Sequence, residues 1–298
     1  MLDKIYLEIT NVCNLDCSFC HKTAREKRFM TKEEFDLLTN KLQGKIKYLY
    51  FHLMGEPTLH PHLPEFIKAA REKGFLPIIT TNGSLLEKRG DALIENIPYK
   101  ISISLHAPEA NPAFNSKGYI DSCISFARRA AEKECIVALR LWNLGSDADN
   151  SEILARLHEA FPDEWVPVRR GSGQRLAHKI FLEWGDRFEW PDQPENEEKS
   201  KCSSCGEQGC QKSNKSESSD TPSAFCYALR DQAGVLVDGT IVPCCLDADG
   251  RIPLGNLFTD ELEDALSSPR AKALYNGFSQ RRAVEPLCQS CGFIKRFK

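Results

Sequence analysis

The 298-residue sequence has neither a long hydrophobic run nor a marked excess of charge of either sign. No apolar segment approaches the roughly 20 residues that a helix needs to cross a bilayer, so we expect no contact with membranes. The 39 Lys and Arg residues against 42 Asp and Glu residues leave a net charge of −3, which gives no overall attraction to nucleic acid. The chain shows no internal repeat and begins with a strand-like segment instead of a signal peptide.

Cysteine, by contrast, is abundant. The chain has 13 cysteines, an odd and high number. Without a signal peptide we do not expect a disulfide framework, and metal binding in a reducing compartment is favoured. The sequence therefore predicts a cytoplasmic protein. With 41% hydrophobic residues, the chain can bury either one large core or a large and a small one.

Short apolar segments alternate with helical patterns from residue 4 to about 190. The predicted strands cover residues 4–10, 48–53, 76–80, 100–105, 136–141 and 180–184. The predicted helices cover residues 31–43, 62–73, 85–96, 117–134 and 153–161. A capping box, Thr31 with Glu34, should begin the first helix. This alternation predicts an α/β fold with a parallel sheet, whose functional residues collect at the carboxyl ends of the strands.

The composition changes at about residue 191. Residues 192–223 are polar with almost no aliphatic side chains, which indicates a linker or loop, and a globular pattern returns at Phe225. We therefore expect a first domain, a polar connection that contains cysteines, and a small C-terminal domain. Their predicted bounds are residues 1–190, 191–224 and 225–298.

Three cysteines follow the first predicted strand at close spacing: Cys13, Cys17 and Cys20. A C-x3-C-x2-C triplet can hold three irons of a [4Fe–4S] cluster, which leaves the fourth iron open for a substrate or cofactor. The alternatives are a zinc site with His21 as the fourth ligand, or a chance grouping.

The triplet resembles the signature of the radical S-adenosylmethionine (radical SAM) enzymes. Met54-Gly55-Glu56-Pro57 is similar to the GGEP motif of that family, with methionine in place of the first glycine. The resemblance implies a partial (β/α)6 barrel of the TIM type and one cluster that binds SAM. It also implies reductive cleavage of SAM to a 5′-deoxyadenosyl radical, driven by a flavodoxin- or ferredoxin-type electron donor.

Further contacts to SAM are expected through the resemblance. Phe19 would flank the adenine, the backbone of the loop at Gly55 would bind the amino group, and Arg140 would pair with the carboxylate. The other expected contacts lie in the same loop or at later strand ends: Glu56, Pro57, Asn82, Ser102 and Ser104. Asn82-Gly83 also fits an ordinary turn. His52 and His106 fit satisfied core or loop histidines.

A second group of cysteines occupies the last part of the chain. Twelve residues separate Cys226 from Gly239, four separate Gly239 from Cys244, and 43 separate Cys244 from the pair Cys288 and Cys291. This order resembles the opening of the SPASM domain and its shortened form, the twitch domain. Both carry auxiliary [4Fe–4S] clusters, and these four cysteines suit one cluster. A zinc site with four cysteine ligands is the alternative.

The remaining cysteines are less informative. Cys202, Cys205 and Cys210 could bind zinc or a third cluster, or belong to a polar loop with oxidisable thiols. Cys245 stands where the sulfatase-maturing relatives place an aspartate base, so their chemistry is not supported here. It is interpreted as facing substrate or as a buried thiol. Two more, Cys123 and Cys135, are expected in the core.

Together the motifs predict a radical SAM enzyme of the oxidoreductase or maturase type that is assisted by an auxiliary cluster. A strand that starts at residue 4 leaves no room for a separate leader-binding domain. We therefore expect a small metabolite, or a peptide bound without such a domain. Glu183, Asp186 and Glu189 are candidates for an acid or base that the sequence does not assign.

Two other classes of function stay open at this point. An RNA-modifying radical SAM enzyme is suggested by the cysteine loop and by Arg169, Arg170, Arg175 and Lys179. The second class is a non-enzymatic Fe–S or zinc-binding regulatory protein, for which we would expect no cleavage of SAM.

Overall fold

The computed structural model describes residues 2–111, 114, 117–144, 149–169, 171–191 and 224–297. The predicted linker, with Cys202, Cys205 and Cys210, lies outside these residues, as does Arg170. A metal site in that linker therefore stays a prediction.

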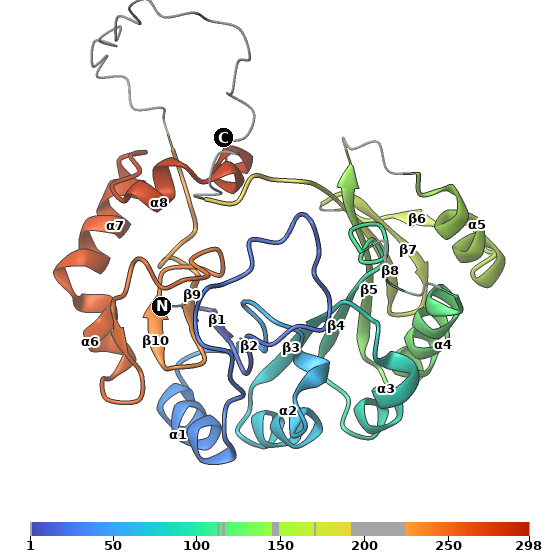
Figure 1. The fold of residues 1–298 in the computed structure, drawn as a ribbon, viewed down its shortest axis with the longest axis horizontal. Coiled ribbons are helices and arrows are strands. Elements are labelled where there is room, and N and C mark those ends of the chain that lie inside the picture. The colour runs from blue at the N-terminus through green and yellow to red at the C-terminus, as the bar shows by residue number, and fades with distance from the viewer. Residues whose placement is uncertain are drawn as a thin grey trace, which may run out of the picture.

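One curved sheet of eleven strands organises the molecule (Figure 1). Seven of its strands are parallel, in the order β9–β1–β2–β3–β4–β5–β8. They are β1 (Lys4–Leu7), β2 (Tyr48–Tyr50), β3 (Leu76–Thr81), β4 (Lys100–Ser104), β5 (Ile136–Leu144), β8 (Ile180–Asp186) and β9 (Gln232–Val235). Six of these are the predicted strands, so the parallel α/β barrel is confirmed.

Five helices connect the barrel strands and lie along the outer side of the sheet in Figure 1. They are α1 (Lys32–Leu42), α2 (Leu63–Glu72), α3 (Leu86–Glu95), α4 (Tyr119–Glu132) and α5 (Ser151–Ala160). The predicted capping box begins α1: the Glu34 amide donates to the Thr31 hydroxyl (3.1 Å), and the Thr31 amide donates to the Glu34 carboxylate (2.8 Å). No helix in the described ranges is long and apolar enough to cross a bilayer.

Both edges of the sheet carry antiparallel strands that the sequence did not indicate. At one edge, β7 (Gly173–Ala177) pairs with β8, and β6 (Val166–Pro167) pairs with β7. At the other, β10 (Thr240–Val242) and β11 (Gly255–Asn256) extend β9. Because β9 pairs in parallel with β1, the C-terminal region continues the barrel sheet.

The remaining helical elements are short and belong mainly to the C-terminal region. They are α6 (Leu262–Ser267), α7 (Pro269–Ser279), α8 (Pro286–Gln289) and the 3-10 turns η1 (Pro57–Leu59) and η3 (Gly292–Arg296). In Figure 1, α6 and α7 lie beside β10, on the side of the sheet opposite β6.

Side chains alternate between the two faces of the barrel strands, as the pleat requires. One set packs against the helices and is fully buried: Ile5, Leu49, Ile79, Ile101 and Leu139. The alternate set lines a cavity inside the barrel: Tyr6, Tyr50, Thr80, Ser104 and Arg140. The sheet thus separates an apolar outer layer from a polar and aromatic interior.

His60, which follows η1, is buried in its neutral form. Its Nε2–H donates to the Met30 carbonyl (2.9 Å), and its Nδ1 accepts from the His62 amide (3.1 Å). A second proton would have to sit on Nδ1, facing an N–H group. Burial therefore lowers the pKa of His60 to about 4, outweighing the Met30 hydrogen bond that raises it, while His62 and Arg89 lower it and Glu65 raises it.

We predict that the protein loses stability as pH falls from about 6.5 to about 4, because the unfolded histidine binds a proton that the folded one excludes. This contribution is fully present above pH 6.5 and amounts to at most about 3 kcal/mol. His60→Gln should flatten the slope of unfolding free energy against pH, measured by urea titration. The control His178→Gln, at an exposed histidine, should keep the wild-type slope. Equal slopes for all three proteins would contradict the prediction.

Candidate functional site at the carboxyl end of the barrel

The cysteine triplet lies on the segment 8–30 between β1 and α1, the dark blue trace across the centre of Figure 1. The pKa of Cys13 is raised to about 11, first by partial burial and then by the charges of Glu56, Cys17 and Cys20. A backbone hydrogen bond at Leu15 lowers this pKa but does not outweigh them. Cys17 and Cys20 therefore lie close enough to Cys13 to act on its thiol electrostatically. Such a group gains stability when bound iron supplies positive charge.

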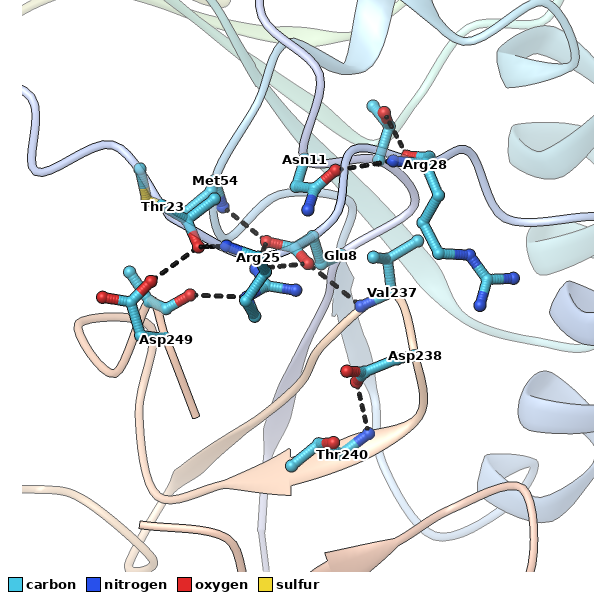
Figure 2. Close-up of polar contacts among 12 residues, drawn as sticks. Glu8, Asn11, Thr23, Arg25, Arg28, Met54, Val237, Asp238, Thr240 and Asp249 are labelled. Atoms are coloured by element: carbon cyan, nitrogen blue, oxygen red, sulfur yellow. Dashed lines mark hydrogen bonds and ion pairs between the residues drawn. The ribbon is translucent and has the colours of Figure 1, made fainter. Parts of the chain in front are cut away.

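A buried carboxylate anchors this segment at its start. Glu8 is fully buried, and its two oxygens accept hydrogen bonds from the Arg25 guanidinium at 2.7 and 2.8 Å. The same oxygens accept from the backbone amides of Met54 (3.1 Å) and Val237 (3.0 Å). Figure 2 shows these groups converging on Glu8. One side chain thus joins β1, the cysteine segment, the Gly-Glu-Pro loop and the C-terminal region.

Asp249 holds the far end of the triplet. Its carboxylate accepts from the Thr23 hydroxyl (2.6 Å) and from His21 Nε2 (2.9 Å), and Arg25 Nε donates to the neighbouring Ala248 carbonyl (2.8 Å). Burial alone would raise the pKa of Asp249, but the hydrogen bonds from Thr23 and His21 outweigh it and the pKa is lowered. His21, the fourth ligand in the zinc alternative, thus has its Nε2 committed to Asp249.

The Gly-Glu-Pro loop passes against the backbone of the cysteine segment. Gly55 has a φ of +78°, and a Cβ placed on it would lie 2.5 Å from the Thr10 carbonyl oxygen. The next amide, of Glu56, donates to the Val12 carbonyl (2.8 Å). Glycine is therefore required at position 55 both for its conformation and for the close approach.

The Glu56 side chain is turned inward, with 2% of it exposed. It accepts from the Thr58 amide and hydroxyl (3.0 and 2.6 Å), the Thr81 hydroxyl (2.7 Å) and the Asn82 amide (2.7 Å). Burial still raises its pKa, although these hydrogen bonds lower it. The carboxylate joins the loop to the end of β3, a structural role that the motif alone did not reveal.

The other residues expected around SAM occupy different settings. Phe19 lines the cavity beside His106 (ring centroids 5.2 Å apart), and its carbonyl accepts from Trp190 Nε1 (3.0 Å). Asn82 donates to Asn14 in the cysteine segment (3.0 Å). On β4, Ser104 lines the cavity, while Ser102 is 1% exposed and its hydroxyl has no partner among the described residues.

Arg140 lies in the cavity but already has partners. Its Nε donates to Glu183 (3.2 Å), which also pairs with Lys100 (2.7 Å), and its guanidinium lies 4.6 Å from the centre of the Trp142 ring. Burial would raise the pKa of Glu183, but Lys100 and Arg140 together lower it. Glu183 is therefore a carboxylate at neutral pH with two cationic partners, which makes it a poor candidate for an acid.

The four C-terminal cysteines, Cys226, Cys244, Cys288 and Cys291, all line the same cavity. Burial, then the charges of Cys226 and Cys291, raises the pKa of Cys288 well above its usual range. The pKa of Cys244 is likewise raised by burial, and next by Cys245 and Cys226. The structure thus brings together thiols that are up to 65 positions apart in the sequence.

The donor atoms of both cysteine groups are thiols, which suit iron–sulfur clusters. Within the described ranges, no three His, Cys, Asp or Glu side chains gather as ligands of one metal ion. The cysteines of a cubane bind different irons and lie farther apart than the ligands of one zinc ion. The donor set of three thiols on the segment 8–30 and four at the cavity fits two iron–sulfur clusters, and assignment of the individual ligands stays a prediction.

The cavity has a volume of about 740 Å³. Ser18 and Phe19 of the cysteine segment line it together with Cys245, Asp186 and Glu189. Its other polar and aromatic lining residues include Tyr6, Tyr50, His52, Trp142, Phe188, Trp190, Tyr227, Phe293 and Phe297. Tyr6 and Tyr50 were not predicted, and His52 was expected only as a satisfied core or loop histidine. The alternate positions of these residues on the first two predicted strands could have indicated an inward direction.

His52 and Cys245 give the cavity two distinctive groups. Burial, then the charge of Arg140, lowers the pKa of His52 to about 3, and its buried Nδ1 has no partner among the described residues. Cys245 interacts with the Tyr6 hydroxyl, and burial raises its pKa to about 11. Cys245 is thus a largely buried thiol in the wall of the cavity, and the interpretation that it faces substrate stays a prediction.

Comparison with known families gives two matches. The profile of the Radical SAM superfamily matches residues 7–158, about half of the chain. The profile of SPASM, an iron-sulfur cluster-binding domain, matches residues 226–292. Both resemblances seen in the cysteine motifs are confirmed. Neither match supports zinc.

Similar proteins span several kinds of substrate. Fe-coproporphyrin III synthase of Methanosarcina barkeri is 30% identical over 184 residues, which cover 57% of this chain and 45% of that protein. The chain spans less than half the length of the curated relatives that it matches.

Solved structures of low sequence identity share the fold. BtrN in complex with AdoMet and 2-DOIA has a TM-score of 0.55 at 18% identity, covering 98% of this chain and 93% of that one. Streptococcus suis SuiB bound to the precursor peptide SuiA has a TM-score of 0.55 at 15% identity, covering 99% and 70%.

We predict that Gly55→Ala destabilises the protein by about 1–3 kcal/mol more than Gly44→Ala, because its Cβ would collide with backbone. Gly44 is the matched control: its φ is +75°, but a Cβ there would meet nothing within 4 Å. Both variants carry the strain of a left-handed residue, about 1–2 kcal/mol, so only the collision distinguishes them. Urea unfolding at neutral pH measures the difference, and equal losses would contradict the close approach.

Proposed function

The chain belongs to the radical SAM superfamily, and we propose that it is an enzyme that abstracts hydrogen from a substrate bound in the 740 Å³ cavity. The observation that carries the proposal is that both cysteine groups adjoin this one cavity. Ser18 and Phe19, between Cys17 and Cys20, line it, and so do the four C-terminal cysteines. A substrate there would lie between the two cluster sites.

Three cysteines, Cys13, Cys17 and Cys20, would hold the SAM-binding cluster. When bound and reduced, that cluster supplies the electron that cleaves SAM to methionine and a 5′-deoxyadenosyl radical. Phe19, which lines the cavity, would contact the adenine. Arg140 would reach the SAM carboxylate only by sharing its charge with Glu183, its present partner.

The C-terminal cysteines would hold one auxiliary cluster of the twitch kind, next to the substrate. Aromatic side chains lie around them and would exclude water once a substrate covers them: Phe293 packs on Phe188 (5.2 Å between centroids) and on Phe297 (5.5 Å), which packs on Tyr227 (5.2 Å). Excluding water protects a reactive intermediate from side reactions. Within the superfamily this supports an oxidoreductase or maturase that receives electrons from a low-potential donor.

The cavity has the size of a small-molecule site, for which about 300–1,000 Å³ is typical. We therefore propose a small metabolite or one side chain of a peptide as the substrate. The similar proteins include both kinds: a coproporphyrin synthase by name, and SuiB with a bound precursor peptide. Of the basic residues behind the RNA alternative, the three that the structure describes, Arg169, Arg175 and Lys179, do not line the cavity, and Lys179 pairs with Glu134 (3.4 Å).

We predict that the anaerobically reconstituted protein, given SAM and dithionite, forms 5′-deoxyadenosine and methionine in equal amounts. Cys17→Ala should abolish both products, because one iron of the cluster loses its ligand. The matched control Cys135→Ala, at a core cysteine that is 1% exposed, should retain them. Products are quantified by liquid chromatography and mass spectrometry. If the iron-loaded wild type gave no 5′-deoxyadenosine, the proposed function would be wrong.

A further inference from the structure

Asn111 contacts the cysteine triplet from the segment that follows β4. It is 8% exposed, and its side-chain amide makes three hydrogen bonds. Its Oδ1 accepts from the Asp16 amide (2.8 Å), while its Nδ2 donates to the Ala107 carbonyl (2.7 Å) and to Cys17 Sγ (3.0 Å).

The orientation of this amide is fixed by its partners. A backbone amide can only donate and a backbone carbonyl can only accept, so Asp16 must face Oδ1 and Ala107 must face Nδ2. The second N–H of Nδ2 is then directed at the Cys17 sulfur. Reversing the amide would break both backbone bonds and place an oxygen against the sulfur.

The same segment braces the residues on either side of Cys17. Asp16 is held by Asn111, and the Ser18 amide donates to the Ala110 carbonyl (3.2 Å). Three consecutive residues of the triplet therefore make hydrogen bonds to residues 110 and 111. This fixes the position of Cys17 relative to the cavity.

We propose that Asn111 is a positioning residue that keeps an N–H···S hydrogen bond to Cys17 in the cluster-bound protein and raises the reduction potential of that cluster. The proposal rests on the proposed function, since it requires a cluster on the triplet. Reduction adds negative charge to the cluster and its sulfur ligands. A donor held against one sulfur stabilises the reduced form more than the oxidised form. Asn111 would thus ease reduction of the cluster by the low-potential donor, the step that precedes the cleavage of SAM.

The test is an anaerobic redox titration of the full-length reconstituted protein, followed by EPR. The cluster on the triplet is identified by the change that added SAM produces in its EPR signal. Asn111→Ala should lower the ratio of reduced to oxidised cluster about tenfold at a fixed potential, a midpoint about 59 mV more negative for a one-electron couple.

Asn14→Ala is the matched control. Asn14 lies within the triplet and joins it to Ser84 (2.8 Å) and Asn82 (3.0 Å), with neither bond directed at a sulfur. It should leave the midpoint unchanged. If both variants shifted the midpoint equally, or if Asn111→Ala left it at the wild-type value, Asn111 would be an ordinary loop tether and the proposal would be overturned.

A measurement on protein without a change at Asn111 covers the case in which Asn111→Ala fails to fold or to bind iron. Wild-type protein and Asn14→Ala are labelled with 15N in the asparagine side-chain amides, and pulsed EPR records nitrogen coupling to the reduced cluster. Coupling in both proteins supports the hydrogen bond, and its absence in either overturns the proposal. A wild type without any SAM-sensitive EPR signal would instead overturn the proposed function itself.

Discussion

The buried ion pair between Glu8 and Arg25 is the interaction on which the site depends. Glu8 is inaccessible to solvent, and a buried carboxylate is tolerated only when its charge is paired and its oxygens accept hydrogen bonds. Arg25 supplies the charge, and the amides of Met54 and Val237 supply two further donors. Removing one partner of such a pair typically costs about 3–5 kcal/mol. That penalty favours the one arrangement in which β1, the cysteine segment, the Gly-Glu-Pro loop and the C-terminal region all meet at Glu8.

This arrangement explains how the segment that carries the triplet and the four C-terminal cysteines come to lie beside one cavity. β1 lies between β2 and β9, so the segment that follows it emerges between the barrel and the C-terminal region. Arg25 and Asp249 then bind that segment to the loop after Cys245. The continuous sheet and these polar contacts hold the triplet and the C-terminal cysteines in a fixed relation. The proposed electron transfer between two clusters and a substrate would require that proximity.

Local patterns predicted the barrel well, because each strand and helix carries its own periodicity. The Thr31 and Glu34 cap could be predicted since both partners lie within one turn. The hairpin of β6 and β7 could not, because its two strands are short, mostly exposed or half-buried, and without a clear alternation of apolar and polar residues. The parallel pairing of β9 with β1 joins residues more than 200 positions apart, which no local pattern reveals.

In the candidate site, too, local sequence predicted some features, whereas others depend on contacts between distant parts of the chain. Cysteine spacing predicted both groups, because cluster ligands are chemically distinctive. The inward role of Glu56 and the contacts of Arg25 and Asn111 were missed, since a polar side chain gives no sign of its partner until the chain is folded. Arg140 shows the reverse: its strand predicted an inward direction, but its pairing with Glu183 depends on a neighbouring strand.

The central claim is that this chain holds two separate clusters beside one cavity. The most direct test is to count iron and sulfide in three anaerobically reconstituted proteins. They are the wild type, a Cys13, Cys17 and Cys20→Ala variant, and a Cys226, Cys244, Cys288 and Cys291→Ala variant. The account predicts about eight irons in the wild type and about four in each variant. About four irons in the wild type and none in the first variant would show that the C-terminal cysteines hold no cluster, and would contradict it.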